Sequence, residues 1–313
     1  MKALALAYTM LTSSHNPYNR CFKVDTPWIR PPRREEVLSW FKSGALYGFA
    51  TLFYGKSIGG AIWAWVSDDG KPQISICVDP ELPPAEQITS TRLLLSWAKL
   101  WFRRKGISGI ISIRAGVEHS FTHELVSRVL NSIAIVTHTD TIMVLQGEPT
   151  RLHRKSLAVR IRAGDIGDAE AIVRVYNRAF SRYDWYTPIT LEEYRSWLAC
   201  NNVRLLVIEY EGRVIGVLEY RCYRALDGKE TMYVEGLAVD PDYQGRGVAT
   251  RLLEEALTSR LCSVERVYLD AVAGLEKFYA RFGFREHGKY VVLSTPLDAL
   301  PNTTPTLEFN TLS

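Results

Sequence analysis

The sequence contains no hydrophobic run long enough to cross a membrane. A membrane-spanning helix needs about 18 or more consecutive apolar residues, and no stretch of this chain comes near that length. Residues 1–11 are apolar but lack the charged start and the cleavage site of a signal peptide. We therefore expect a cytoplasmic protein with no membrane partner.

Cysteine is scarce, and the Cys-x-x-Cys pattern is missing altogether. The five cysteines are scattered along the chain, at positions 21, 77, 200, 222 and 262. An odd number without close pairs predicts reduced thiols and no zinc site. His119 and His123 lie one helical turn apart, but Ser120 stands where a zinc-protease helix carries Glu. We expect no bound metal.

The chain also lacks a strong excess of charge of either sign. It has 38 Lys and Arg against 34 Asp and Glu, a formal net charge of +4 in 313 residues. Two short basic runs, at 103–105 and 151–155, are not interleaved with aromatic residues. Such runs are typical of a solvated helix end and a linker, so we expect no nucleic-acid partner. The length indicates about two domains, and both a monomer and a homodimer are compatible with it.

Parts of the sequence repeat at a nearly constant separation. Residues 35–40 read Glu-Glu-Val-Leu-Ser-Trp, and residues 192–197 read Glu-Glu-Tyr-Arg-Ser-Trp. Val-Asp-Pro ends at Pro80 and again at Pro241, and each copy is followed by Thr-Arg-Leu-Leu. An ordered series of matches predicts two copies of one fold. We place the first copy at 1–147, a linker at 148–157, the second copy at 158–295 and an irregular tail at 296–313.

The second copy contains a loop suited to binding an anion. An apolar strand ending at Val239 is followed by Gln244-Gly-Arg-Gly-Val248 and then by a helix over 249–259. Gly245 and Gly247 let the backbone approach a ligand closely. The first amides of the helix have no intrahelical partner and lie at the positive end of its dipole. Together these features predict a pyrophosphate site.

Two other nucleotide-binding loops also contain closely spaced glycines. A P-loop needs a Lys after its last glycine, and none is present. A dinucleotide-binding loop would begin as Gly245-x-Gly247, but Thr250 stands in place of its third glycine. Asp270 lies at a distance suited to a ribose partner, so NAD remains an alternative.

The loop resembles the coenzyme A motif of the GNAT superfamily of N-acetyltransferases, which reads Gln or Arg, two residues, Gly, one residue, and Gly or Ala. Here it runs from Gln244 to Ala249 between a strand and a helix. The resemblance implies acetyl-CoA as the cosubstrate. The residues it implies for cofactor binding are Leu237, Ala238, Val239, Gln244, Gly245, Arg246, Gly247, Val248, Ala249 and Thr250.

A second GNAT-like motif follows at the expected distance. A helix over 275–282 contains Phe278-Tyr279 and ends before Gly283-Phe284. In that family the Tyr four residues before the Gly-Phe pair protonates the departing thiolate, which implies this role for Tyr279. Packing alone is the other interpretation. Many relatives carry an Asn seven residues before the Tyr, and Val272 stands there instead.

The order of predicted elements in the second copy matches the GNAT fold. We predict strands at 159–161, 204–210, 214–223, 232–239, 267–272 and 290–293, with helices ending at 180 and spanning 191–200, 249–259 and 275–282. The predicted fold is α/β (α+β), with two tandem GNAT-like domains that each have a mixed, mostly antiparallel twisted sheet flanked by helices. One degenerate half gives the chain a layout that resembles the mycothiol synthase family.

The first copy has no coenzyme motif. Its counterpart of the loop lacks glycine and contains Pro83 and Pro84, which have no N–H to donate. Glu81 and Glu86 would repel a pyrophosphate. We therefore predict one cofactor per chain, bound by the second copy.

The remaining site residues concern the base and the amine acceptor. Glu235 lies on the strand before the loop and is the first choice for general base, with Glu219 in reserve and an ion-paired Glu235 as the other interpretation. Four residues between the first two helices are predicted to contact the acceptor, with Asp184 attracting a cationic amine and the rings covering its apolar part. They are Tyr183, Asp184, Trp185 and Tyr186; an exposed loop is the equally open alternative.

The predicted activity is transfer of an acyl group, most simply acetyl, from acyl-CoA to a primary amine in a ternary complex. The acceptor is a small molecule or a peptide. Two alternatives are a CoA-binding regulatory protein without turnover and a tandem-GNAT aminoacyltransferase that uses charged tRNA.

Overall fold

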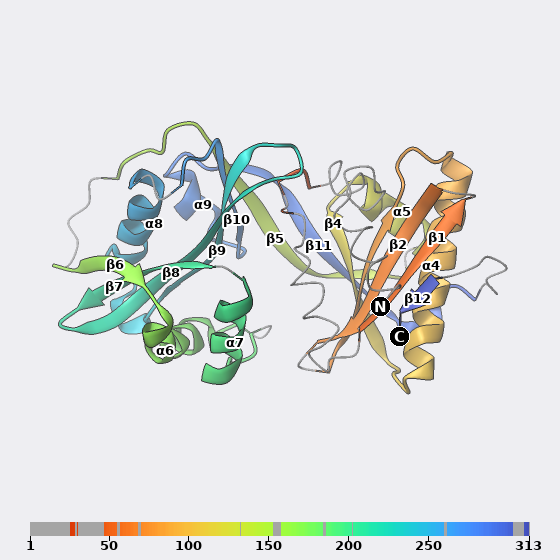
Figure 1. Ribbon diagram of the computed structural model, residues 1–313, viewed down its shortest axis with the longest axis horizontal. Coiled ribbons are helices and arrows are strands. Elements are labelled where there is room, and N and C mark those ends of the chain that lie inside the picture. The colour runs from red at the N-terminus through yellow and green to blue at the C-terminus, as the bar shows by residue number, and fades with distance from the viewer. Residues whose placement is uncertain are drawn as a thin grey trace. The chain divides into compact units, whose positions relative to one another are not determined.

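The computed structural model describes residues 26–28, 30, 47–54, 57–67, 70–131, 133–152, 158–183, 186–201, 203–259, 262–302 and 310–312. The chain forms two compact units, each with strands and helices (Figure 1). Unit 2 comprises residues 142–224 and 229–287, and unit 1 comprises the chain up to 141 together with 225–228 and 288–313.

Unit 2 contains a mixed sheet with the strand order β5-β10-β9-β8-β7-β6. All pairs from β6 to β9 are antiparallel, whereas β9 and β10 are parallel. The strands are β6 (Arg160–Gly164), β7 (Arg204–Tyr210), β8 (Arg213–Arg224), β9 (Glu230–Val239) and β10 (Arg266–Ala271). This arrangement confirms the predicted fold class for the second half of the chain.

Two helix pairs enclose two apolar clusters in unit 2. Helices α8 (Val248–Thr258) and α9 (Glu276–Ala280) pack on one cluster that includes Leu252 and Phe282. Helices α6 (Ala169–Phe180) and α7 (Leu191–Asn201) pack on the other, which includes Val175. Each cluster combines one face of the strands with the apolar stripe of the helices, as alternation along a strand requires.

The start of α6 shows how local sequence fixes an element. Asp165 Oδ1 accepts the Gly167 N–H at 2.7 Å, and Asp168 Oδ2 accepts the Asp165 N–H at 3.0 Å. This reciprocal capping box leads through the short helix η1 (Ile166–Asp168) into α6. The predicted helix end at residue 180 is confirmed.

Unit 1 repeats the order of elements seen in unit 2. Strands β1 (Tyr47–Tyr54), β2 (Ser57–Val66) and β3 (Pro72–Val78) are antiparallel neighbours, helix α4 (Pro84–Arg104) follows, and β4 (Ile110–Val117) is parallel to β3. Helix α5 (Phe121–Leu130) then leads to β5 (Ile135–Gln146). A pair of parallel strands joined through a helix occurs in both units, β3 and β4 in unit 1 and β9 and β10 in unit 2, as two copies of one fold require.

The repeated Val-Asp-Pro has the same hydrogen bonds in both units. The Asp79 N–H donates to Gly59 O at 2.9 Å, and its carboxylate accepts the Glu81 N–H at 3.0 Å. The Asp240 N–H donates to Ile215 O at 2.8 Å, and its carboxylate accepts the Asp242 N–H at 3.2 Å. A buried Asp therefore follows β3 in one copy and β9 in the other for the same structural reason.

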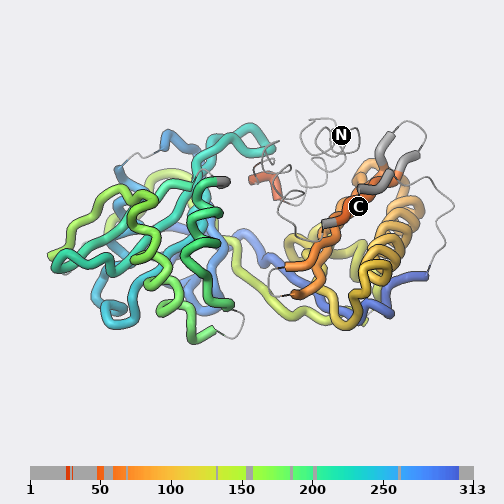
Figure 2. Tube along the Cα trace, turned by 60° about the horizontal axis from the view of Figure 1, so that its bottom comes forward, coloured from red at the N-terminus to blue at the C-terminus, as the bar shows by residue number. Residues whose placement is uncertain are grey.

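Each unit is completed by a strand from the other half of the sequence. Strand β11 (Arg285–Pro296) pairs antiparallel with β4, from Tyr290 opposite Val117 to Pro296 opposite Ile110, and Figures 1 and 2 show the two side by side. Unit 2 in turn includes the end of β5 from residue 142, next to β10. The sequence placed the strand at 290–293 in the second copy, whereas contacts place residues from 288 onward in unit 1.

The described part of the tail is more ordered than the sequence indicated. Residues 310–312 form β12 (Asn310–Leu312), which pairs antiparallel with β1, so the expectation of an irregular tail is wrong there. Lys99 on α4 is buried, and its ammonium donates to Asp298 O at 2.6 Å and Leu300 O at 2.7 Å. These bonds explain how a buried lysine is tolerated and how it anchors the chain after β11.

The cysteines depart from the expectation of reduced thiols. Cys222 on β8 and Cys262 after α8 form a disulfide with a Cα–Cα separation of 6.3 Å. The sequence could not show this pair because 40 residues separate its members and only the sheet brings them together. Cys77 is buried, and the expectations for Cys21 and for the side chain of Cys200 lie outside the described residues.

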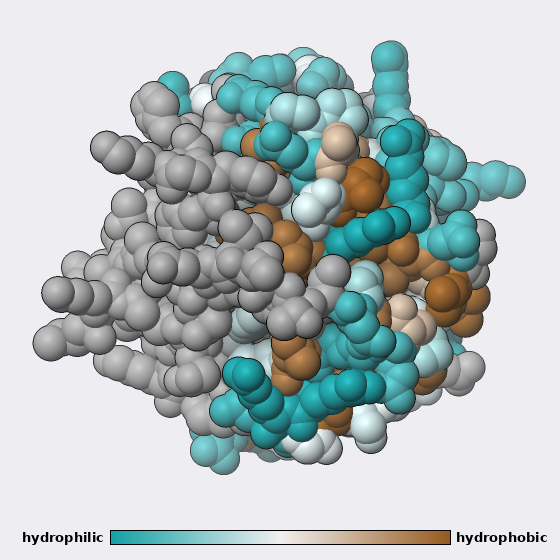
Figure 3. Space-filling view, turned by 90° about the vertical axis from the view of Figure 1, so that its right-hand side faces the viewer, coloured by the Kyte–Doolittle hydropathy of each residue, from teal (hydrophilic) through white to brown (hydrophobic). Residues whose placement is uncertain are grey.

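The described surface mixes polar and apolar residues. Figure 3 shows hydrophobic side chains between hydrophilic ones on the side of the molecule that carries α4. Single exposed apolar residues, such as Leu100 at 38% exposure, are normal in a folded protein. Within the described ranges, no helix is both long and apolar enough to span a membrane.

Candidate functional site

The loop between β9 and α8 borders a cavity of about 220 Å³ in unit 2. The cavity contains no acidic side chain in its lining, which consists of Val239, Tyr243, Gln244, Gly245, Gly247, Val248, Ala249, Thr250, Phe278 and Arg281. Seven of the residues predicted to bind the cofactor are in this set. Leu237, Ala238 and Arg246 are not: Ala238 is buried on the opposite face, and Arg246 Cζ lies 5.7 Å from the ring centroid of Tyr243.

The backbone of this loop has the conformation that the glycines predict. Gly245 has φ +73° and Gly247 has φ +82°, and Gly247 is the N-cap of α8. Neither the cap nor the first turn of α8 supplies an acidic side chain. The free amides of the first turn therefore face a cavity where nothing negative competes for them, which suits a pyrophosphate.

Two interactions hold the loop in place from outside the cavity. Gln244 Nε2 donates to Val239 O at 2.9 Å, which ties the loop back to its strand. Arg178 on α6 donates to both oxygens of the fully buried Asp240 at 2.6 Å and to Asp242 at 3.0 Å. The bidentate pair joins the end of β9 to α6.

Replacing Gly245 by Ala tests the loop directly. A Cβ has room there, yet φ +73° disfavours any L side chain, so the loop would have to adjust where it approaches phosphate. We expect the Kd for acetyl-CoA to rise about tenfold, measured by calorimetry. Gly106→Ala is a matched control, because Gly106 has the same φ and equally open surroundings and lies after α4. Equal effects of the two variants on the Kd would contradict the site.

Tyr279 is buried on α9, with 7% exposure. It contacts Phe278 and Phe284 edge-on. Burial, and then the nearby Tyr183 hydroxyl, hold the pKa of Tyr279 above its usual range. The hydroxyl therefore keeps its proton at neutral pH, as a general acid must. The Val272 carbonyl accepts the Leu275 N–H at 3.0 Å just before the helix.

The predicted acceptor residues are only partly described. Asp184 and Trp185 lie outside the described residues. Tyr183 is close enough to Tyr279 to affect its pKa, and Arg182 donates to the Tyr183 hydroxyl at 2.9 Å. Tyr186 donates to Asn177 Oδ1 at 2.7 Å and packs against Phe180. Tyr183 thus lies near Tyr279, the candidate acid, while Tyr186 packs on the end of α6.

Glu235 lies where the pairing of β8 and β9 shifts. Glu219 pairs with Gly236 and Tyr220 with Val234, so Glu235 is the extra residue of a β-bulge. Its Oε1 forms an ion pair with Arg221, and both side chains are about 15% exposed. The other oxygen, Oε2, is buried and has no hydrogen-bond partner among the described residues. Accepting a proton would cost Glu235 its ion pair.

Glu219 lies on β8 beside the same bulge, with 5% exposure. Tyr194 donates to its Oε1 at 2.5 Å. Burial raises the pKa of Glu219 to about 7, against the lowering effect of hydroxyls from Tyr194 and Tyr176 and of the more distant Arg221. A carboxylate that titrates near neutral pH is suited to accept a proton from an amine.

Sequence reasoning missed the partners that surround these groups. It did not single out Tyr176, Tyr194, Arg178 or Asp240. The repeated Val-Asp-Pro was a usable signal for Asp240, because a polar residue kept in both copies indicates a shared structural bond. No sequence signal joins the two tyrosines to Glu219, since they lie on three different elements.

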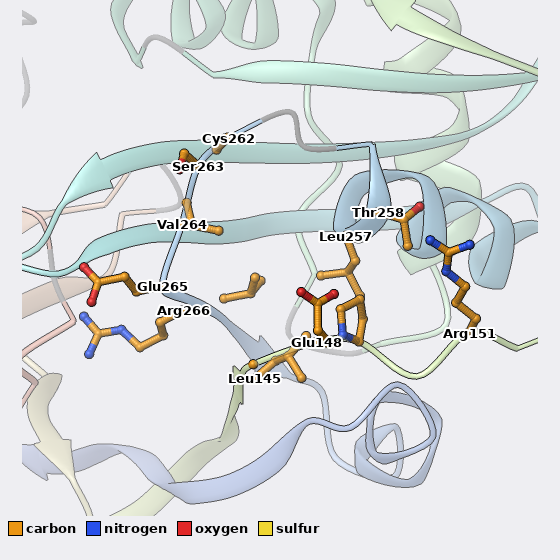
Figure 4. Close-up of a pocket in the computed structure, with 13 residues that line it drawn as sticks. Leu145, Glu148, Arg151, Leu257, Thr258, Cys262, Ser263, Val264, Glu265 and Arg266 are labelled. Carbon is orange, nitrogen blue, oxygen red and sulfur yellow. The ribbon is translucent and has the colours of Figure 1, made fainter.

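A larger cavity of about 520 Å³ lies elsewhere in unit 2, next to Cys262. In Figure 4 Glu265 and Arg266 lie at one end, Arg151 and Thr258 at the other, and Glu148 between them. Charges of both signs alternate along this lining, so it favours no single class of ligand. No group of three or more possible metal ligands occurs within the described residues.

Comparison with known proteins finds a family match within unit 2. Residues 169–284 match the model of the acetyltransferase (GNAT) family. A histidine N-acetyltransferase from Scomber australasicus is 32% identical over 114 residues, which cover 36% of this chain and 31% of the relative. The match thus spans about a third of that curated relative.

Two solved structures share the fold over most of the chain. One is a GCN5-related N-acetyltransferase from Sphaerobacter thermophilus, with 18% identity, 93% of each chain covered and a TM-score of 0.63. The other is a tandem GNAT protein from the clavulanic acid biosynthesis pathway, with 13% identity, 89% of this chain and 93% of that chain covered and a TM-score of 0.65. Residues 169–284 thus match the acetyltransferase (GNAT) family, and the two solved structures show that this fold extends over most of the chain.

Proposed function

We propose that the protein transfers an acetyl group from acetyl-CoA to a primary amine within a ternary complex. The observation that carries this proposal is the cavity at the start of α8, whose two glycines and free amides suit a pyrophosphate. The family match over the same residues supports it. The catalytic domain is proposed at 158–295. Within this range, β11 pairs with β4 of unit 1.

The amine attacks the thioester carbon, the C–S bond breaks, and the thiolate needs a proton as it departs. We assign this proton to Tyr279, which is buried in the same unit and keeps its hydroxyl proton at neutral pH. The backbone of 237–239 is proposed to align the donor along β9. The amides of 244–250 are proposed to bind its pyrophosphate.

The amine must lose a proton during attack, and two carboxylates flank the bulge of β9. Glu235 was the first choice from the sequence, but its ion pair with Arg221 opposes protonation. Glu219 has no ion pair of its own in the described structure, and its pKa of about 7 suits a base. We therefore propose Glu219 as the base. Glu235 remains the alternative. A pH–rate profile that is the same in Glu219→Gln as in the unsubstituted protein would favour Glu235.

For the acceptor, we keep Tyr183, Asp184, Trp185 and Tyr186 as the proposed contacts. The curated relative is named a histidine N-acetyltransferase, so free amino acids belong in the acceptor panel. Peptide N-termini, lysine peptides, polyamines and amino sugars complete it. Asp184→Asn and Trp185→Ala should raise the KM for the true acceptor. If both variants leave the KM of every acceptor unchanged, these residues do not contact it.

One cofactor per chain is expected, and calorimetry measures it. In unit 1 Pro84 begins α4, and Gln87 donates to Pro80 O at 3.1 Å and Leu82 O at 2.8 Å. The first turn of α4 is thus hydrogen-bonded to the loop that precedes it. We expect acetyl-CoA to bind with a stoichiometry of one and NAD to give no heat. A stoichiometry of two would contradict this, and no binding of any CoA would instead favour the tRNA-dependent class.

Binding without turnover is the remaining alternative. A CoA-binding regulatory protein would bind acetyl-CoA as tightly as an enzyme does, yet it would acetylate nothing in the acceptor panel. Release of free CoA that depends on an added amine separates the two, since hydrolysis would release CoA without it. Amine-dependent release together with the acetylated product establishes the transferase.

A further inference from the structure

The buried carboxylate of Glu219 is enclosed by two tyrosines from different helices. Tyr194 on α7 donates its hydroxyl proton to Glu219 Oε1 at 2.5 Å, and both side chains are about 5% exposed. Tyr176 on α6 is 8% exposed and packs on Tyr194 with ring centroids 6.4 Å apart. Its hydroxyl is close enough to help lower the pKa of Glu219, though no hydrogen bond of normal geometry joins the two.

The bulge of β9 is shaped to admit one of these hydroxyls. A Cβ built at Gly236 would overlap Tyr176 Oη and would lie 3.1 Å from Glu219 Oε2. Only a glycine therefore leaves room for Tyr176 to reach the carboxylate beside the bulge. Glu219 and Gly236 are direct partners across β8 and β9, so carboxylate, hydroxyl and bulge meet at one point of the sheet.

The charges around this point are few. Arg221 is the cation that acts on Glu219, and it is itself paired with Glu235. Besides burial, the Asp168 carboxylate, which is paired with Arg162, raises the pKa of Tyr194, and Tyr186 raises the pKa of Tyr176. The groups nearest to the buried carboxylate are thus neutral hydroxyls, of which Tyr194 donates a hydrogen bond to it. Neutral donors stabilise a carboxylate without making it as weak a base as an adjacent cation would.

We propose that Tyr176 and Tyr194 are positioning residues that hold the Glu219 carboxylate at the β9 bulge and keep it available as a proton acceptor. The proposal rests on the role of Glu219 given above. The two hydroxyls counteract the burial that would otherwise leave Glu219 protonated at neutral pH. Gly236 makes the arrangement possible, and no sequence motif of the cofactor loop includes any of these residues.

The test is the pH dependence of kcat/KM in Tyr194→Phe and Tyr176→Phe. Removing a donor to a carboxylate raises its pKa, so the acid limb should move to higher pH by about one unit. The acceptor amine also titrates, but its pKa is the same for every variant. The shift between variants therefore isolates Glu219. Tyr220→Phe is the matched control, because Tyr220 is buried at 4% exposure on the opposite face of β8. In this variant the acid limb of the kcat/KM profile should not move.

A second measurement does not depend on turnover. Infrared spectroscopy follows the C=O band of a protonated carboxyl, and Glu219→Gln identifies which band belongs to Glu219. The band should persist to higher pH in Tyr194→Phe and in Gly236→Ala, which displaces the Tyr176 hydroxyl. Circular dichroism confirms that each variant is folded, and a variant that does not fold is replaced by the other two.

The outcomes separate this inference from the proposed function. Unshifted titration of Glu219 in all three variants would overturn the role of the tyrosines, even if turnover fell. A shifted titration in a protein that acetylates no amine would support the tyrosines and refute the transferase. Equal shifts in Tyr220→Phe would show a general loosening of β8 and would also overturn the inference.

Discussion

Tyr279→Phe should lower kcat about 100-fold while changing the Kd for acetyl-CoA less than threefold. A positioned general acid contributes on the order of 100-fold or more to a rate, and the hydroxyl is needed only as negative charge develops on sulfur. The ring would remain packed against Phe278 and Phe284, so the fold and the cavity should be preserved. Steady-state kinetics and calorimetry give the two quantities separately.

The opposite patterns have clear meanings. A Kd that rises as much as kcat falls would show that Tyr279 shapes the cofactor cavity instead of donating a proton. An unchanged kcat would assign the proton to solvent. Because the pKa of Tyr279 is raised, its hydroxyl should cause no alkaline loss of activity below about pH 10. Such a loss, if it persists in Tyr279→Phe, belongs to another group.

Asp240→Ala should lower the free energy of unfolding by about 3 kcal/mol. The fully buried Asp240 carboxylate accepts hydrogen bonds from Arg178 through both of its oxygens, and hydrogen bonds to charged groups contribute about 1.5–3 kcal/mol each. The substitution also removes the acceptor for the Asp242 N–H at the start of the loop. Urea unfolding followed by circular dichroism measures the change.

Asp242→Ala is the matched control for this prediction. Asp242 binds the same Arg178 at 3.0 Å but its side chain is 65% exposed, and exposed ion pairs contribute less than about 1 kcal/mol. Equal losses from the two substitutions would show that burial of Asp240 is not what matters. The affinity for acetyl-CoA should fall more in Asp240→Ala, because the buried Asp240 carboxylate joins the end of β9 to α6 through two hydrogen bonds, whereas the exposed Asp242 forms one.

The cofactor loop and its flanking elements were predictable because they depend on local rules. Gly245 and Gly247 predict positive φ in the loop. The strand before it ends at Val-Asp-Pro, and the apolar spacing of the segment after it predicts a helix. The internal repeat was visible for a similar reason, since two copies of one fold keep the same residues at the same structural positions. Glu235 and Glu219 were likewise recognised as the carboxylates near the site.

Which of those carboxylates suits a base was decided by the surroundings of each. Arg221 pairs with Glu235, whereas hydroxyls from α6 and α7 surround Glu219. Both carboxylates lie on strands with similar local sequence, so their difference exists only after helices pack on the sheet. Burial and hydrogen bonding across elements determine a pKa, and neither is encoded in a local pattern.

The sequence by itself therefore determined the two copies, the order of their elements, the glycine loop and the position of Tyr279. The tertiary structure decided that β11 pairs with β4, that Cys222 meets Cys262, and that Tyr176 and Tyr194 enclose Glu219. The physical reason is the range of the interactions involved. Turns, caps and periodicity act within a few residues, whereas strand pairing, disulfides and buried hydrogen bonds join residues that are close only in the folded chain.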